Sequence, residues 1–201
     1  MNRAEATLSI DERILLAALE CFVEKGYHGT SVRDIATRSN LSVPGLYHYF
    51  PSKATLLERL MDQTMDDLIA QTEGALSRAR PDPVDRFAAV ITAHVRFHCE
   101  RPEESFVGNS ELRSLVGDLR RTVMEKRDRQ QAFFDQVVEE GIEGGVFEPD
   151  DAHMPALALA SMCTAVSMWY RRDGPLAPDD VVSIYRDFGL QMMGYKGGAD
   201  S

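Results

Sequence analysis

Apolar residues recur three and four positions apart along most of the chain, which is the spacing of one buried face of an α-helix. The alternation of apolar and polar residues that marks a half-buried β-strand is missing from the sequence. The pattern therefore predicts an all-α protein. Its first helix is expected to begin with a capping box of Ser9 and Glu12 and to end at Gly26.

Two short helices are predicted next. One starts near Thr30 or Ser31 and ends near Asn40. The other takes Ser42 as its N-cap and has Pro44 in its first turn, where a missing N–H does no harm. Two short helices joined by so tight a turn predict a helix-turn-helix.

Further helices are predicted between breaks at proline and glycine. They cover about residues 53–80, 83–100, 103–114, 117–143, 152–172 and 179–194. We expect a helix-turn-helix domain at residues 1–52 and a larger helical domain at residues 53–196. A flexible tail is expected at residues 197–201.

Composition narrows the class of protein. The chain has 201 residues, 44% of them hydrophobic, as in a soluble globular protein, and no signal-peptide pattern marks its N-terminus. Three widely spaced cysteines without a C-x-x-C pair argue against disulfides and cysteine-bound zinc. The longest uncharged run, residues 154–170, includes Ser and Thr and predicts a buried helix, not a membrane span. A cytoplasmic protein without membrane contact is expected.

The formal net charge of −10 is distributed unevenly. Residues 1–53 contain six basic and six acidic side chains, so the remaining residues hold the whole negative charge. An acidic surface repels nucleic acid. An anionic partner is therefore expected to meet the first quarter of the chain.

That first quarter carries a specific signature. It reads G-Y-H-G-T-S-V-R-D-I-A from Gly26 to Ala36 and L-S-V-P-G-L-Y-H-Y-F-P-S-K from Leu41 to Lys53. Over about residues 8–57 the chain resembles TetR-family transcriptional repressors. Asn40 stands where that family usually has glycine, and asparagine tolerates the same left-handed backbone. The resemblance implies DNA contacts at Thr30, Ser31, Pro44, Gly45, Tyr47, His48 and Lys53.

The residues themselves favour the same interpretation. Leu46 and Phe50 are four apart and are expected to pack inward, which leaves an outer face with few bulky groups for base edges in a major groove. Tyr47 and Lys53 can each donate to a phosphate, as can groups at the start of the second helix. The predicted DNA-binding residues are Thr30, Ser31, Arg33, Ser42, Val43, Pro44, Gly45, Tyr47, His48 and Lys53.

The larger domain is expected to bind an effector. Arg127 and Gln130 interrupt an apolar helix face, and Arg127 either reaches the rim or meets a polar group of a ligand. His94 and His98 are four apart, which leaves open a metal site, a ligand contact or a hydrogen-bonded structural role. The predicted effector-binding residues are His94, Phe97, Phe106, Asn109, Arg113, Arg127, Phe134, Met162, Val166 and Trp169. No metal ligand and no cofactor is predicted.

The last two helices are expected to form a dimer interface. Ala156, Ala160 and Thr164 lie on a small-residue stripe that lets another helix approach closely. The resemblance to the TetR family implies that these helices from two copies form a four-helix interface. A short recognition helix reads only a half-site and gains affinity from a second copy.

The C-terminal region has a looser resemblance. S-E-L-R-S-L from Ser110 and M-W-Y-R-R-D-G-P-L from Met168 are similar to the TetR subgroup of fatty-acid and steroid catabolism regulators that respond to acyl-CoA thioesters. The implied protein is a homodimeric repressor that binds a palindromic double-stranded operator and is released by a small, largely apolar effector.

The alternative is a helical small-molecule-binding protein or an enzyme with a vestigial helix-turn-helix. The sequence shows no Ser/His/Asp or Cys/His set, no glycine-rich phosphate loop and no paired-carboxylate motif. An enzyme is therefore not expected.

Overall fold

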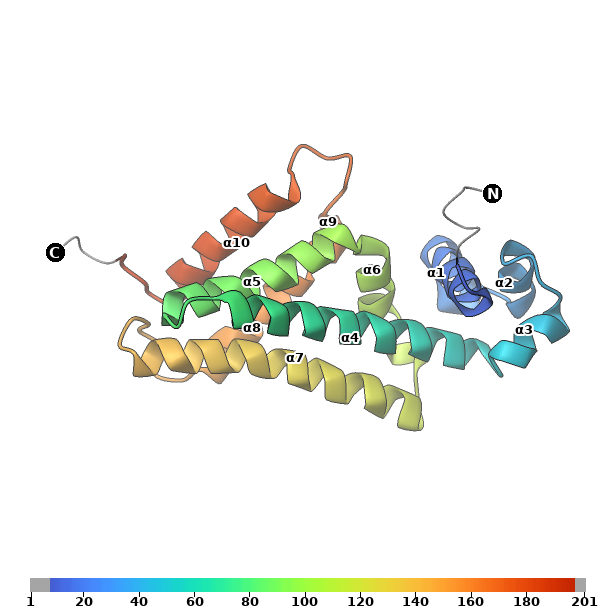
Figure 1. Cartoon of the computed structure of the whole chain (residues 1–201), viewed down its shortest axis with the longest axis horizontal. Helices are drawn as coiled ribbons and strands as arrows, with labels where there is room; N and C mark the ends of the chain where they lie inside the picture. Colours follow the sequence, from blue (N-terminus) through green and yellow to red (C-terminus); the bar gives the residue numbers. More distant parts are fainter. Residues whose placement is uncertain (1–7, 198–201) are drawn as a thin grey trace. The chain divides into compact units, whose positions relative to one another are not determined.

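The computed structural model describes residues 8–197, and every regular element in this range is a helix (Figure 1). The all-α prediction is confirmed. The predicted tail lies, apart from Gly197, outside the described residues. The elements are α1 (Ile10–Gly29), α2 (Val32–Arg38), α3 (Val43–Tyr49), α4 (Lys53–Arg78), α5 (Pro83–Glu100), α6 (Pro102–Ser110), the 3₁₀ turn η2 (Leu112–Ser114), α7 (Gly117–Glu143), α8 (His153–Thr164), α9 (Val166–Trp169) and α10 (Pro178–Met192).

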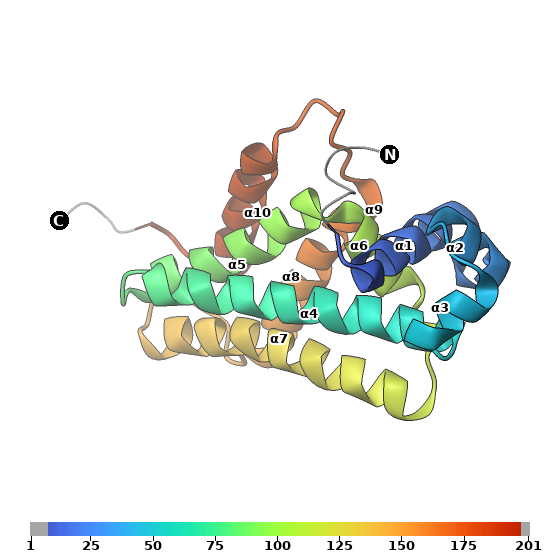
Figure 2. The same cartoon turned by 45° about the vertical axis from the view of Figure 1, so that its right-hand side comes forward.

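The chain forms two compact units. The first unit holds the chain up to Thr64 together with Glu103–Met124, and the second unit holds Met65–Pro102 and the chain from Glu125 onward. In the first unit α1, α2 and α3 gather around one another (Figure 2). Their apolar faces share one core with the start of α4 and with Val107 and Leu115.

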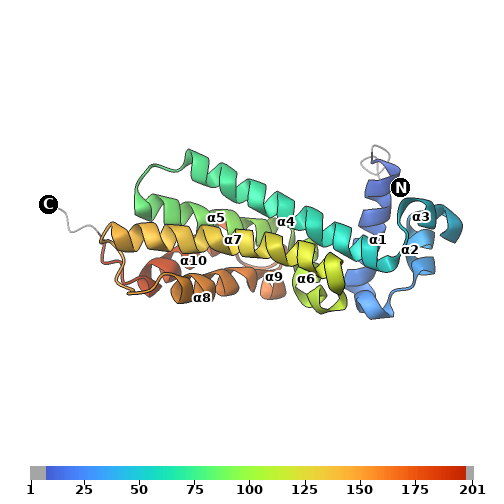
Figure 3. The same cartoon turned by 90° about the horizontal axis from the view of Figure 1, so that it is seen from below.

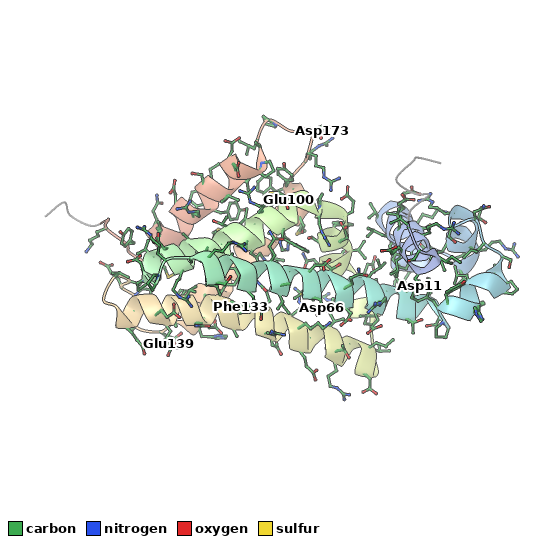
Figure 4. All side chains as sticks on the ribbon, in the orientation of Figure 1. Asp11, Asp66, Glu100, Phe133, Glu139 and Asp173 are labelled. Atoms are coloured by element: carbon green, nitrogen blue, oxygen red, sulfur yellow. The ribbon has the colours of Figure 1, made fainter. Side chains whose placement is uncertain are left out.

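In the second unit, parts of α4 and α7 run side by side (Figures 1 and 3). Lys126 Nζ lies 2.7 Å from Asp66, which is labelled in Figure 4, and Arg129 pairs with Glu73 at 2.5 Å. α5 packs against α8, α9 and α10. Gly189 lets α10 approach α5 closely, because a Cβ there would lie only 2.7 Å from Ile91 Cδ1.

The predicted helix at residues 152–172 is two helices, α8 and α9, and ends at Trp169. The Ser167 hydroxyl donates to the Thr164 carbonyl at 3.0 Å, a local bond that competes with the helical ladder. The predicted helix at residues 103–114 is likewise divided into α6 and η2.

The small-residue stripe of α8 faces inward. Ala156 and Ala160 are buried in the core of the second unit, among helices of the same chain, and Thr164 is half-buried with its hydroxyl 2.9 Å from His94 Nε2. The prediction that this stripe meets a second copy is therefore wrong. A helix that is apolar on all sides gives no sign of which side its own chain covers.

Candidate nucleic-acid interface and buried polar cluster

The turn between α2 and α3 has the predicted conformation. Asn40 has φ 58°, in the left-handed region. The Leu41 N–H donates to the Ala36 carbonyl at 2.8 Å, which closes the end of α2. The Ser42 hydroxyl accepts from the Gly45 N–H at 3.1 Å and caps α3. Capping at both ends of the turn fixes the direction of α3.

α3 exposes a polar and aromatic face. Leu46 is completely buried, whereas Pro44 and His48 are exposed and Tyr47 keeps 48% of its surface. The structure thus brings Pro44, Tyr47 and His48 together on one outer face, beside the half-buried Gly45. A narrow, exposed helix face of this kind can approach base edges.

Two residues of α3 differ from expectation. Val43 is half-buried and packs against the core of the first unit, which leaves it less available to DNA than predicted. Tyr49 is 39% exposed, with its ring edge-on to His48 at 5.3 Å between centroids. Tyr49 was not among the predicted DNA-binding residues. Its place next to His48 in a short amphipathic helix was the signal that could have indicated an exposed side chain.

Thr30 lies inside the protein. Its side chain is 2% exposed, and its hydroxyl donates to the carbonyls of Gly26 at 2.8 Å and Cys21 at 2.9 Å. The expectation that the Thr30 hydroxyl holds a phosphate is therefore corrected. The hydroxyl satisfies carbonyls at the end of α1, where the kink at Gly26 interrupts the ladder.

The N-terminus of α2 already holds an anion of the protein. The Asp34 carboxylate accepts from the Ser31 N–H at 2.8 Å and from the Ser31 hydroxyl at 2.5 Å. The bond from Lys25, then those from Ser31, keep the pKa of Asp34 well below its usual range. Ser31 and Arg33 are exposed, but the Ser31 hydroxyl serves the capping box.

Lys53 is held at the junction of α1 and α4. Its ammonium donates to the carbonyls of Tyr27 at 2.6 Å and Thr30 at 2.7 Å and lies 4.2 Å from the centroid of the Tyr27 ring. Burial lowers the pKa of Lys53. An ammonium has three donors, so one N–H remains for a phosphate while two fix the helices.

The second unit contains a buried polar cluster, which we define as Thr72, His94, Gln130 and Thr164. The Gln130 amide nitrogen donates to Thr72 Oγ1 at 3.1 Å and to His94 Nδ1 at 3.3 Å. With Nδ1 as acceptor, His94 Nε2–H donates to Thr164 Oγ1 at 2.9 Å. The cluster thus links α4, α5, α7 and α8 by hydrogen bonds in an apolar core.

Both histidines of α5 have lowered pKa values, which favours the neutral ring at pH 7. Burial lowers the pKa of His94 well below its ordinary value, and the charge of Arg127, together with that of His98 when it is protonated, acts in the same direction. Burial also lowers the pKa of His98 to about 4, although its bond to the His94 carbonyl at 2.8 Å opposes the shift. The rings stack with their centroids 4.5 Å apart. A neutral His94 can offer one donor and one acceptor.

The predicted effector-binding residues fall into three groups. Phe97, Phe134 and Val166 are buried with His94 in the second unit, and Arg127 and Met162 are half-buried there. Trp169 lies at the surface, 45% exposed and stacked on Tyr185. Phe106, Asn109 and Arg113 belong to the first unit. Thr72 was missed, because nothing local in the sequence marks a threonine that faces Gln130.

Large apolar side chains are exposed on the last helices. They are Met154, Leu157, Met168, Trp169, Ile184, Phe188 and Met192, which we call the apolar face of α8–α10. Phe188 keeps 49% of its surface. Ile184, Phe188 and Met192 are spaced four apart and share one side of α10, and exposed apolar side chains on one face indicate an interaction site.

Residues 8–197 contain neither a membrane-spanning helix nor a candidate metal site. No helix there is long and apolar enough to cross a membrane. Nor do His, Cys, Asp and Glu side chains within that range form a group of three or more that could hold a metal ion.

Comparison with known proteins agrees with this geometry. The repressor KstR2 of Mycobacterium tuberculosis is 28% identical over 174 residues, which cover 86% of each chain. A tetR-family regulatory protein of Rhodococcus RHA1 has a TM-score of 0.87 at 29% identity, covering 94% of this chain and 99% of that one. AibR, solved with isovaleryl coenzyme A and operator DNA, has a TM-score of 0.82 at 21% identity, covering 93% and 100%. The similarity to AibR is one of fold.

Two family descriptions match the chain. "Bacterial regulatory proteins, tetR family" matches residues 14–60, which contain the helix-turn-helix. "Tetracyclin repressor-like, C-terminal domain" matches residues 80–193, more than half of the chain. The chain therefore belongs to the TetR family and is a transcriptional regulator, not an enzyme.

Proposed function

We propose that this regulator is a homodimeric repressor that binds a palindromic operator through α3 of each copy. The observation that carries the proposal is the capped α3 with Pro44, Tyr47 and His48 exposed on its outer face. A helix of 7 residues reads few base pairs, so specificity and affinity require a second copy. The likeness to KstR2, which is named a repressor, supports repression over activation.

The apolar face of α8–α10 is the proposed dimer interface. It lies on the helices that the family resemblance indicates, but it uses their outward residues and not the small-residue stripe. Association of two such faces removes exposed side chains such as Leu157, Ile184 and Phe188 from water. Each Å² of apolar surface buried in this way stabilises the dimer by roughly 25 cal/mol. Two copies related by a two-fold axis then present two α3 helices to two half-sites.

The effector is a small, largely apolar molecule, and the candidate class is an acyl-CoA thioester. An acyl chain suits the apolar surroundings of the cluster, where Phe134 and Val166 belong to one core and Phe97 packs in another with Met65 and Leu68. The His94 Nε2–H, which donates to Thr164, can donate instead to the thioester carbonyl. Arg127, half-buried on α7, lies three residues before the cluster residue Gln130, and its charge lowers the pKa of His94. That a protein of this fold, AibR, takes isovaleryl coenzyme A supports the class.

Release requires that the effector bind more tightly to a conformation whose two α3 helices no longer match the half-sites. Equal affinity for both conformations would shift nothing. α4 supplies a physical connection, because it begins at Lys53 in the first unit and carries Thr72 in the second. A change of hydrogen bonding at Thr72 can therefore be passed along one continuous helix.

The function is tested by fluorescence anisotropy with a duplex from upstream of the protein's own gene. We expect an affinity that falls steeply as salt rises, because displaced counterions drive phosphate binding. Medium- and long-chain acyl-CoAs and the matching free acids are then titrated against the complex. Release by a thioester, weakened in Arg127→Ala, supports the effector class. Release only by uncharged or cationic compounds contradicts it.

The dimer is tested by Phe188→Asp, with Ser183→Asp as a matched control at an exposed polar position of the same helix. An unpaired carboxylate in an apolar interface costs several kcal/mol, so Phe188→Asp is expected to be a folded monomer whose affinity for DNA falls more than about 100-fold. Ser183→Asp is expected to stay dimeric. Light scattering measures the mass, and a dimeric Phe188→Asp contradicts the interface.

A further inference from the structure

The first unit contains a hydrogen-bonded connection between the helix-turn-helix and the segment Glu103–Met124. Gly26 has φ 69° and ψ 165°, which interrupts α1 one residue before Tyr27. The Tyr27 N–H donates to Glu111 Oε1 at 3.0 Å. A Cβ at position 26 would lie 3.4 Å from the same oxygen, and the positive φ favours glycine there. The kink thus presents a backbone donor to a distant carboxylate.

Tyr27 is held from its other side by Lys53. The Lys53 ammonium donates to the carbonyls of Tyr27 and Thr30, and its charge lies over the Tyr27 ring. Lys53 begins α4, and the residues between Thr30 and Lys53 are α2 and α3. These bonds therefore close a loop that contains the whole helix-turn-helix pair. Any displacement of Tyr27 moves the base of that loop.

Glu111 is itself fixed. Its Oε2 accepts from the Ser114 hydroxyl at 3.0 Å, and its N–H donates to the Val107 carbonyl at 3.0 Å. Ser114 Oγ also lies 3.3 Å from His28 Nε2, which gives a second contact between η2 and the end of α1. Val107 and Leu115, on either side of Glu111, are 1% exposed in the core of the first unit. The carboxylate is thus carried by a rigid segment.

We propose that Glu111 is a positioning residue for DNA recognition: through the Tyr27 N–H it fixes the end of α1, and with it the orientation of α3. The role rests on the proposed DNA-binding function. Glu111 and Tyr27 belong to the same compact unit, so this contact acts within the first unit.

The test compares Glu111→Ala and Glu111→Gln with Glu104→Gln, which removes a charge from the same segment. Loss of a hydrogen bond to a charged group is expected to weaken DNA binding about tenfold in Glu111→Ala. Glu111→Gln keeps an amide oxygen that can accept from the Tyr27 N–H and is expected to bind within about threefold of wild type. Glu104→Gln is expected to bind as wild type does. Circular dichroism and light scattering establish that each variant is folded and dimeric.

A second measurement is independent of DNA. Hydrogen exchange of the Tyr27 amide, followed by NMR in the free protein, is expected to be slow in wild type and Glu111→Gln and fast in Glu111→Ala. A fast-exchanging Tyr27 amide in wild type overturns the connection even if DNA binds. Wild-type affinity in Glu111→Ala, or an equal loss in Glu111→Ala and Glu111→Gln, overturns the positioning role. Failure of wild type to bind any duplex instead overturns the proposed function on which the role depends.

Discussion

The two compact units differ in where their candidate functional polar groups lie. In the first unit, Tyr47 and His48 stand on an exposed helix face, supported by caps and by Lys53. In the second unit, Thr72, His94 and Gln130 are at most 4% exposed and bond to one another. The proposed DNA surface is therefore preformed. At the proposed effector site, by contrast, an effector must exchange internal hydrogen bonds for its own.

The largest expected effect is a loss of stability of the second unit at acid pH. His94 and His98 have pKa values below the ordinary 6.5, so the unfolded chain binds protons more readily than the folded one as pH falls from about 6.5 to 4. The contribution of these two histidines to the free energy of unfolding is fully present above pH 6.5 and is lost progressively as the pH falls below it. For His98, with a pKa of about 4, the loss between pH 7 and pH 5 is about 2 kcal/mol, and His94 adds to it.

Urea denaturation at pH 7 and pH 5 measures this loss. His98→Gln removes one of the two groups and is expected to flatten the dependence. Equal stability at the two pH values would show that the histidines are not enclosed.

His94→Leu sharpens the comparison. It leaves a Gln130 N–H and the Thr164 hydroxyl without their partner, which is expected to lower the free energy of unfolding by about 1–3 kcal/mol. DNA affinity without effector is expected to stay at the wild-type value, and the response to acyl-CoA is expected to be lost. His153→Leu is the control. A variant that responds to effector as wild type does would remove His94 from the effector site.

Lys53→Ala is expected to affect both the stability of the first unit and its binding to DNA. The carbonyls of Tyr27 and Thr30 lose their donor, so we expect a loss of about 1 kcal/mol in stability. If the third N–H contacts a phosphate, the slope of log affinity against log salt falls by about one. Arg59→Ala, at an exposed position of α4, is the control. An unchanged slope would leave Lys53 with its structural role alone.

Tyr47→Phe is expected to have the smallest effect. Loss of one phosphate-directed hydroxyl weakens DNA binding by about 1 kcal/mol, and stability is unchanged because the side chain is 48% exposed. His48→Ala is expected instead to change which base pairs are preferred. A Tyr47→Phe variant that melts earlier but binds DNA normally would place the hydroxyl in the fold and not at the interface.

Local features of the fold could be predicted from the sequence. The capping box of Ser9 and Glu12, the interruption at Gly26, the left-handed Asn40 and the cap at Ser42 all depend on neighbours within a few residues. Their geometry is set by the chain itself, so pattern and residue type suffice.

Features that depend on distant contacts could not be predicted. The Tyr27–Glu111 and Thr72–Gln130 hydrogen bonds join residues 84 and 58 positions apart. Gln130 stands out as a polar residue on an apolar helix face, but the local sequence does not show which residue it bonds. The inward stripe at Ala160 was misassigned because α8 is apolar on every side. The occupied Thr30 hydroxyl was missed because the carbonyls that it bonds are freed by a kink whose exact form is tertiary.

The most direct test of the central claim is a selection of duplexes from a random pool by the wild-type protein. The account predicts enrichment of an inverted repeat whose two half-sites are separated by about one helical turn or a multiple of it, as two symmetric α3 helices require. It also predicts that an acyl-CoA thioester, added to the bound pool, releases the enriched sequence. A pool that shows no enrichment, or that enriches a single unrepeated site, would contradict a homodimeric operator-binding repressor.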